Sequence, residues 1–142
     1  MSADRRAIHD AYRRTSYRAT LDSGVSIEIR IGESCAALDA ELRARAAVRW
    51  AFVTASNPHA TRLSESENAA RHAELVDMLA AYACFEGEGA GDDANWLPER
   101  SLLVFEILEA RALRIARRFD QEAIVVGALG EPARLVFCGD AP

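Results

Sequence analysis

Two short apolar runs constrain the fold of this chain more than any other feature. Residues 50–55 read WAFVTA, and residues 101–107 read SLLVFEI. Apolar runs of about four to eight residues, rich in β-branched and aromatic side chains, are typical of strands buried in the middle of a sheet. Each run therefore predicts an inner strand, and helices are expected to pack on the sheet that contains them.

Shorter segments on either side predict the remaining strands. Residues 25–31 alternate apolar and polar side chains with a period of two, as a half-buried strand does. Turn signals at 21–24 and 130–132 each join two of these segments, so we expect two hairpins. The additional strands expected are 17–20, 25–31, 82–86, 122–128 and 133–137.

Helical segments separate these strands. We expect helices at 4–12, 34–47, 65–82 and 109–119, and a loop in the glycine-rich and acidic run 86–93. The resulting order is α-β-β-α-β-α-β-β-α-β-β. It predicts a single α+β domain over residues 1–142, with three to four helices packed on a mixed β-sheet.

The composition excludes several classes of chemistry. All seventeen basic residues are arginine, which rules out a lysine Schiff base and a phosphate-binding loop ending in Gly-Lys. The net charge of −5 disfavours general nucleic-acid binding, which needs a basic face. No apolar run is long enough to cross a membrane, and the first residues lead into no apolar stretch. Three widely spaced cysteines indicate reduced thiols, so we expect a cytoplasmic protein without membrane association.

The candidate site is the segment between the inner strand ending at Ala55 and the helix that follows it. Loops at the carboxyl end of a strand often bind ligands in domains built from sheets and helices. Ser64 and Glu67 match a capping box, which marks the start of the helix. Its inward stripe is Leu75, Met78, Leu79 and Tyr82.

Continued toward the loop, that stripe becomes polar. Steps of three and four residues lead back to Arg71 or His72, and then to Asn68. A polar stripe beside a loop that holds Asn57 and His59 is typical of a small polar pocket. The predicted ligand-binding residues are Asn57, His59, Asn68, Arg71, Trp96 and Glu99.

A structural interpretation of the same residues is open. Asn57-Pro58 is a common turn starter whose side chain bonds its own loop, and Arg71 can pair with a neighbouring glutamate on the helix. Trp96 either covers the edge of the core or forms one wall of the pocket, with Glu99 as its polar contact. Gln121 is a lesser candidate for the same site.

No metal site or cofactor is expected. The three histidines lack ligand spacing, and Asp92 with Asp93 form an acid pair without further ligands. Arg111, Arg114, Arg117 and Arg118 form a basic patch on the last helix, for which we expect a solvated face rather than a nucleic-acid site.

Several of these segments resemble a known family. The resemblance depends on residues 50–58 (WAFVTASNP), then Ser64, Glu67, Asn68 and Arg71, followed by 96–104 (WLPERSLLV) and 119–124 (FDQEAI). They resemble the uncharacterised bacterial domain-of-unknown-function family 3293, over about residues 17–137. The family often has a glycine where this chain has Asp120. The resemblance implies a small stand-alone bacterial protein and no particular activity.

Three functions are compatible with these observations. The leading hypothesis is a non-catalytic domain that binds a small polar ligand or regulates another protein. The second is an enzyme that acts on a small polar or nucleotide-like substrate, with His59 or Glu99 as proton carrier. The third is a protein or RNA contact through the arginine-rich helix. A homo-oligomer is compatible with each of them.

Overall fold

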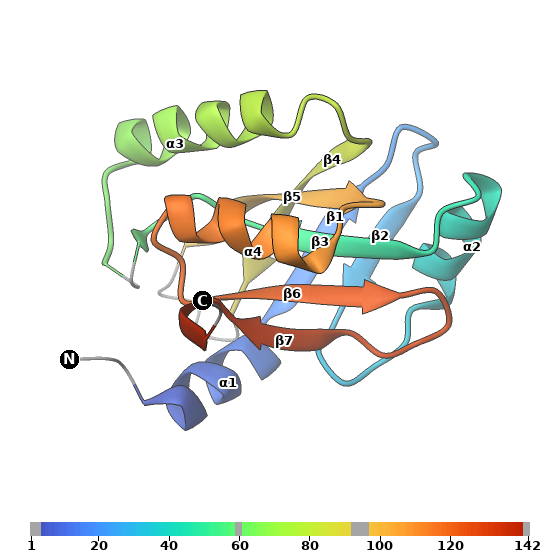
Figure 1. The fold of residues 1–142 in the computed structure, drawn as a ribbon, viewed down its shortest axis with the longest axis horizontal. Coiled ribbons are helices and arrows are strands. Elements are labelled where there is room, and N and C mark those ends of the chain that lie inside the picture. Colours follow the sequence, from blue (N-terminus) through green and yellow to red (C-terminus); the bar gives the residue numbers. More distant parts are fainter. Residues whose placement is uncertain (1–3, 59–60, 92–96, 141–142) are drawn as a thin grey trace.

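The computed structural model describes residues 4–58, 61–91 and 97–140, and four helices of the α type pack on one seven-stranded sheet in these ranges (Figure 1). The elements are α1 (Arg5–Arg13), β1 (Ser16–Thr20), β2 (Ser26–Ile29), α2 (Ala36–Ala44), β3 (Arg49–Val53), α3 (Glu65–Met78), β4 (Cys84–Ala90), β5 (Glu99–Phe105), α4 (Glu109–Arg118), β6 (Ala123–Ala128) and β7 (Arg134–Phe137). The α+β class and the predicted order are confirmed. Among the described residues, no helix has the length and apolar character needed to cross a bilayer.

The sheet has the strand order β2-β1-β4-β5-β3-β6-β7. Both predicted hairpins, β1–β2 and β6–β7, are present, and β3 lies between β5 and β6 as an inner strand. We expected a mixed sheet, but every pairing between the named strands is antiparallel. The parallel component among the described residues is an isolated bridge between Ile31 and Ala133.

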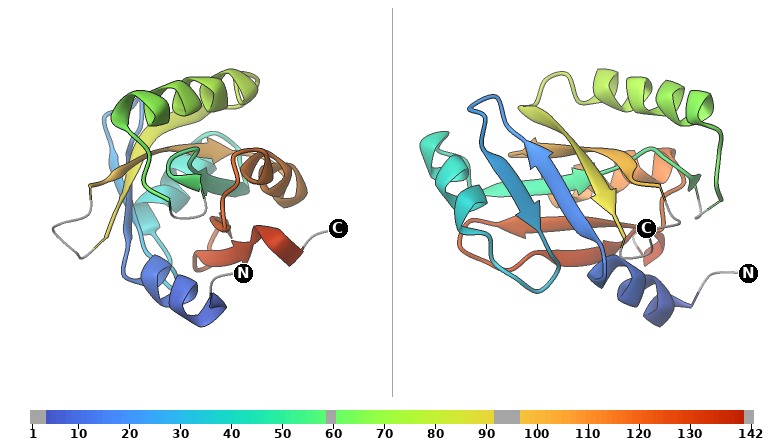
Figure 2. Two further views of the ribbon diagram at one scale, coloured as in Figure 1. Left: turned by 90° about the vertical axis from the view of Figure 1, so that its left-hand side faces the viewer. Right: turned by 180° about the vertical axis from the view of Figure 1, so that it is seen from behind.

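That bridge joins the two edges of the sheet. The amide of Gly32 donates to the carbonyl of Ala133 at 2.8 Å, and the amide of Ala133 donates to the carbonyl of Glu33 at 3.1 Å. Because Ile31 follows β2 and Ala133 precedes β7, the sheet curls until its edges meet there. Figure 2 shows β1, β2 and β4 crossing steeply over the direction of the other strands.

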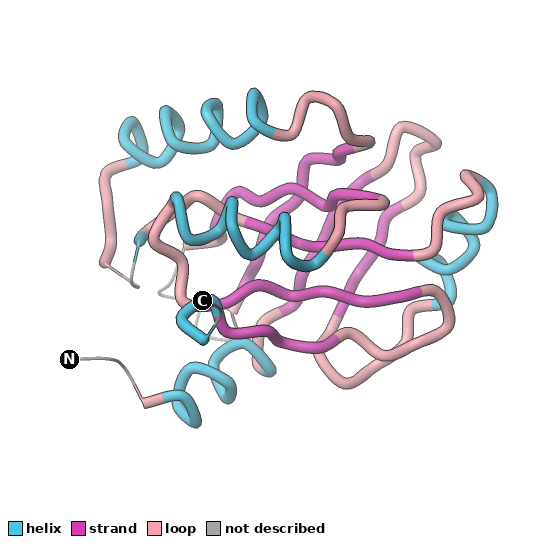
Figure 3. The backbone as a smooth tube through the Cα atoms, viewed as in Figure 1, coloured by secondary structure: helices cyan, strands magenta, loops and turns pink. Residues whose placement is uncertain are grey.

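The curled sheet separates two hydrophobic cores. On β3, Trp50 and Phe52 face the concave core, whereas Ala51 and Val53 face the outer core. Helices α3 and α4 cover the outer face (Figure 3). Helix α2 closes the concave core through Leu38 and Leu42, so both faces of the inner strands are buried, as their composition predicts.

Helix α1 spans the opening between the two halves of the curled sheet. The rings of Tyr12 and Tyr17 lie 6.4 Å apart, which places α1 against β1. The Tyr12 hydroxyl donates to the carbonyl of Ala123 at 3.3 Å, and the Arg5 guanidinium lies 4.8 Å from the centre of the Phe137 ring. Helix α1 therefore contacts β1 on one side and β6 and β7 on the other.

Glu86 ends the predicted strand 82–86 and lies in β4, but the loop predicted from there to residue 93 is wrong for residues 87–90, which continue β4. Gly87 and Gly89 face the concave side, where β1 approaches closely. A Cβ atom on Gly87 would lie 2.4 Å from the carbonyl oxygen of Arg18 and 3.0 Å from the Phe52 ring. Glycine marks a close approach of two backbones here rather than a chain reversal. Residues 92 and 93 lie outside the described residues.

Replacing Gly87 with alanine is expected to destabilise the protein. The added methyl group would meet a backbone oxygen that cannot move without disturbing the β1–β4 pairing, so we expect a loss of about 2–3 kcal/mol in the free energy of unfolding, measured by urea denaturation. Gly139→Ala is the matched control, because nothing lies within 4 Å of a Cβ atom there. Equal stability of the two variants would contradict the close approach.

Candidate functional site

Asn57 joins three parts of the chain at the end of the loop that follows β3. Its Oδ1 accepts from the amide of Leu63 and from Nδ2 of Asn68, both at 2.9 Å. Its Nδ2 donates to Oε2 of Glu99 at 2.7 Å, and its own amide donates to Oδ1 of Asn68 at 3.0 Å. Asn57 has a φ of 49°, a left-handed conformation that asparagine tolerates better than most residues. The side chain therefore links its own loop to α3 and to β5.

The start of α3 is fixed independently of this link. Ser64 caps the helix and forms the predicted capping box with Glu67, with both reciprocal hydrogen bonds present. Asn68 follows Glu67 directly and points back to Asn57, as the polar end of the helix stripe predicts. The two asparagines are joined by two hydrogen bonds, so their main role is to hold the loop in place.

Arg71 reaches the backbone beside the loop. Its Nε donates to the carbonyl of Ala55 at 2.6 Å, and a terminal nitrogen donates to the carbonyl of Phe119. Gln121 is buried and donates to the carbonyl of Ser56 at 2.9 Å. Arg71 and Gln121 thus hold the end of β3 against the end of α4, and Arg71 lines neither of the two cavities described below.

Two cavities meet at Asn57 and Glu99. The first, which we call the α1 cavity, has a volume of about 260 Å³ and lies beneath α1. The second, the loop groove, has a volume of about 700 Å³. The side chains that characterise the α1 cavity are Tyr12, Tyr17, Phe52, Thr54, Glu99 and Gln121. Those of the loop groove are Asn57, Leu63, Asn68, Leu97, Glu99 and Arg100.

Glu99 is the chemically unusual group of this site. It begins β5, and it lines both cavities. Burial raises the pKa of the Glu99 carboxyl above its usual range, and the hydrogen bond from Asn57 offsets part of that rise. A partly buried carboxylate in a cavity is a candidate for ligand binding or for proton transfer.

Aromatic rings form one wall of the α1 cavity. The Tyr17 and Phe52 rings meet edge to face with centroids 5.4 Å apart. Burial raises the pKa of both Tyr12 and Tyr17, so their hydroxyl groups keep their protons throughout the physiological range. We did not predict either tyrosine as a site residue. The available signal was the apolar stripe of Ile8, Ala11 and Tyr12 on an otherwise charged helix.

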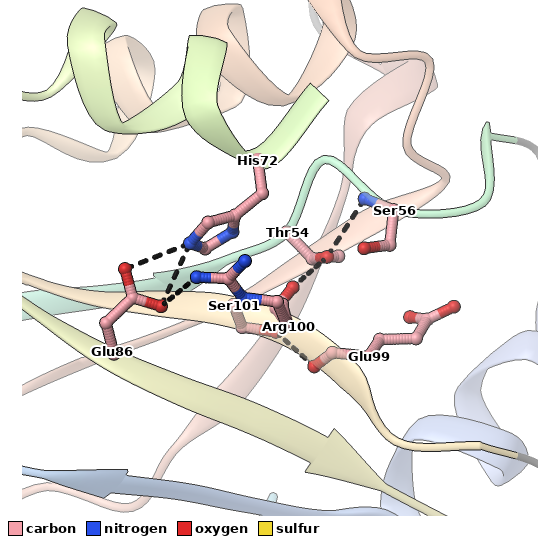
Figure 4. Close-up of polar contacts among 7 residues, drawn as sticks. All are labelled: Thr54, Ser56, His72, Glu86, Glu99, Arg100 and Ser101. Carbon is pink, nitrogen blue, oxygen red and sulfur yellow. Dashed lines mark hydrogen bonds and ion pairs between the residues drawn. The ribbon is translucent and has the colours of Figure 1, made fainter. Parts of the chain in front are cut away.

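A second polar cluster fastens α3 to the outer face of the sheet. The Nε2 atom of His72 lies 2.9 and 3.0 Å from the two carboxylate oxygens of Glu86, and Arg100 donates to Glu86 at 3.2 Å (Figure 4). His72 is only 2% exposed, so of the two alternatives for the inward stripe, His72 is the buried one. Its Nδ1 atom has no hydrogen-bond partner among the described residues.

The remaining predicted residues divide into two groups. His59 and Trp96 lie outside the described residues. On the arginine-rich helix, Arg117 donates to the carbonyl of Cys138 at 2.7 Å and Arg118 pairs with Glu74, so half of the predicted basic patch makes contacts within the protein. Within the described ranges, no cluster of three or more His, Cys, Asp or Glu residues is arranged to hold a metal ion.

The family model described as "Protein of unknown function (DUF3293)" matches residues 53–124. The chain belongs to this family. The matched region includes Asn57, Asn68, Arg71 and Glu99, whereas Tyr12 lies before it. No curated protein and no solved structure matches the chain significantly.

We expect Asn57→Ala to destabilise the protein more than Asn57→Gly. Both substitutions remove the hydrogen bonds to Leu63, Asn68 and Glu99, but only alanine adds the cost of a left-handed backbone. The expected losses in the free energy of unfolding are about 3 kcal/mol for alanine and about 1 kcal/mol less for glycine. Chemical denaturation of both variants measures the difference, and equal losses would show that the backbone conformation contributes nothing.

The raised pKa of Glu99 predicts a characteristic pH dependence of stability. Because the folded protein binds this proton more tightly than the unfolded chain, the contribution of Glu99 to stability falls as the pH rises through the folded pKa. Glu99→Gln is therefore expected to be more stable than the wild type at neutral pH, and the difference should shrink in acid. Thermal unfolding across the pH range measures this.

Glu67→Gln is a control that is expected to change stability at neutral pH in the opposite direction. The hydrogen bonds from Ser64 lower the pKa of Glu67, so its charged form favours folding above the unfolded pKa. The variant is expected to lose stability at neutral pH. A Glu99→Gln variant that behaves like Glu67→Gln would contradict the effect of burial.

Proposed function

We propose that this protein binds a small polar ligand in the α1 cavity without catalysing a reaction on it. One observation carries the proposal, namely the partly buried carboxylate of Glu99 on the wall of a largely apolar cavity. Small-molecule sites are concave and mostly apolar, with a few placed polar groups that orient the ligand.

The position of Glu99 is hard to explain by stability alone. Burying a carboxylate costs free energy, and a glutamine at the same place can accept the hydrogen bond from Asn57 without carrying a charge. A group that lowers stability and faces a cavity is therefore a candidate for a functional role. Glu99 is therefore the direct ligand contact in the proposal.

Three other predicted residues hold Glu99 and its loop in position. Asn57 holds the carboxylate of Glu99, and Asn68 holds Asn57. Arg71 fastens the end of β3, from which the loop departs. These three residues are positioning residues in the proposal, because each makes its hydrogen bonds to other groups of the protein.

An enzyme is the second candidate, and the raised pKa of Glu99 favours it specifically. A carboxyl group whose pKa lies nearer neutrality than usual is suited to general acid or base catalysis. A ligand that is chemically converted by the wild type and left intact by Glu99→Gln would establish this alternative.

A fragment screen observed by two-dimensional NMR tests the proposal. We expect small polar fragments to shift the amide signals of residues around the α1 cavity, such as Thr54, Ser101 and Gln121. Their affinity should fall at least tenfold in Glu99→Gln and stay unchanged in the matched control Glu88→Gln, since Glu88 lines neither cavity. A screen in which no fragment shifts these signals, or in which both variants bind alike, would overturn the proposal.

A further inference from the structure

We propose that the ligand of the α1 cavity is a small organic ammonium ion, with an apolar body and a protonated amine that meets Glu99. The inference rests on the proposed function and adds the chemical class of the ligand. The ligand class follows from the charges on the cavity wall and from which of its hydrogen-bond donors already bond to the protein.

The hydroxyl groups around the cavity already donate their protons to the protein. Each bonds to a backbone carbonyl, so a ligand meets these groups as acceptors. The five donations are Tyr12 to Ala123 at 3.3 Å, Thr15 to Ala11 at 2.8 Å, Tyr17 to Tyr12 at 3.4 Å, Thr54 to Arg100 at 2.7 Å and Ser101 to Glu99 at 3.1 Å.

The side-chain amides are committed in the same way. The amide nitrogen of Gln121 donates to the carbonyls of Ser56 and Phe119 at 2.9 and 3.3 Å. The amide nitrogen of Asn57 donates to Glu99. Most of these side-chain donors are thus engaged, so the cavity suits a ligand that brings donors of its own.

The charged groups on the cavity wall have one sign. Among the described residues that line it, Glu99 and Glu122 are the charged side chains, and none is arginine or histidine. The chain contains no lysine. A phosphate or carboxylate group would meet like charge in a poorly solvated space, whereas an ammonium group would gain a charge-assisted hydrogen bond.

The aromatic wall favours the same class of ligand. The Tyr17 ring lies between two others, with its centroid 6.4 Å from that of Tyr12 and 5.4 Å from that of Phe52. Aromatic rings attract cations through their negative faces at distances up to about 6 Å, and aromatic walls are a common feature of ammonium-binding sites. The volume of about 260 Å³ lies just below the usual range of drug-binding pockets, which limits the ligand to a small body.

Three probes of matched shape test the inference: benzylamine, benzyl alcohol and benzoate. They share an aromatic body and differ in whether the attached group is cationic, neutral or anionic. We expect benzylamine to bind at least tenfold more tightly than the other two, measured by NMR shifts of the cavity residues. This preference should vanish in Glu99→Gln and weaken in Tyr12→Leu, while Glu88→Gln keeps it.

The pH provides an independent readout. Because protonation of Glu99 removes the negative charge, the affinity for benzylamine should decrease as the pH falls through the pKa of Glu99, and the affinity for benzyl alcohol should not. Nα-acetyl-lysine methylamide is a fourth probe. Tighter binding of this probe than of benzylamine would also support an ammonium site and would identify its source as a protein side chain.

The outcomes separate this inference from the proposed function. Tighter binding of benzyl alcohol or benzoate at the α1 cavity would overturn the ammonium class and leave the cavity as a ligand site. If none of the probes shifts the signals of the cavity residues, the ammonium inference fails, and the fragment screen decides the proposed function. A benzylamine preference that persists in Glu99→Gln would place the cation elsewhere and would also overturn the inference.

Discussion

The close contact between β1 and β4 at Gly87 is the constraint on which the rest of this structure depends. The carbonyl oxygen of Arg18 occupies the space that a side chain at position 87 would need. This approach allows the sheet to curl until the Ile31–Ala133 bridge joins its edges. A flat sheet would present two open faces, whereas the curled sheet encloses a core and leaves an opening that α1 covers. The α1 cavity exists because that closure is incomplete.

The polar groups of the site follow from the same geometry. The ends of β3, β5 and β6 lie next to one another, which brings Asn57, Glu99 and Gln121 together from distant parts of the chain. Asn57 and Gln121 form hydrogen bonds to backbone groups of the protein itself, so these bonds do not depend on a ligand. Glu99 is the exception, because its burial opposes its charge. Because burial disfavours the charged form of Glu99, the proposed function is assigned to this one carboxylate.

Sequence patterns predicted local features well. The apolar run at 50–55 predicted the inner strand β3, and the capping box at Ser64 predicted the start of α3. The pattern failed at residues 87–90, because glycine permits a turn and also permits two strands to approach closely. At the site, the polar stripe correctly placed Asn68 against Asn57, but it could not distinguish Arg71 from His72, since residues one position apart lie on overlapping helix faces.

The sequence by itself determined the α+β class, the order of elements, the hairpins, the start of α3 and the absence of lysine chemistry. These properties depend on composition and on neighbours close along the chain. Only the tertiary structure decided that the sheet curls, that Tyr12 and Tyr17 line a cavity, and that Glu99 is partly buried beside Asn57. These depend on contacts between residues far apart in the chain, and periodicity carries no information about such contacts.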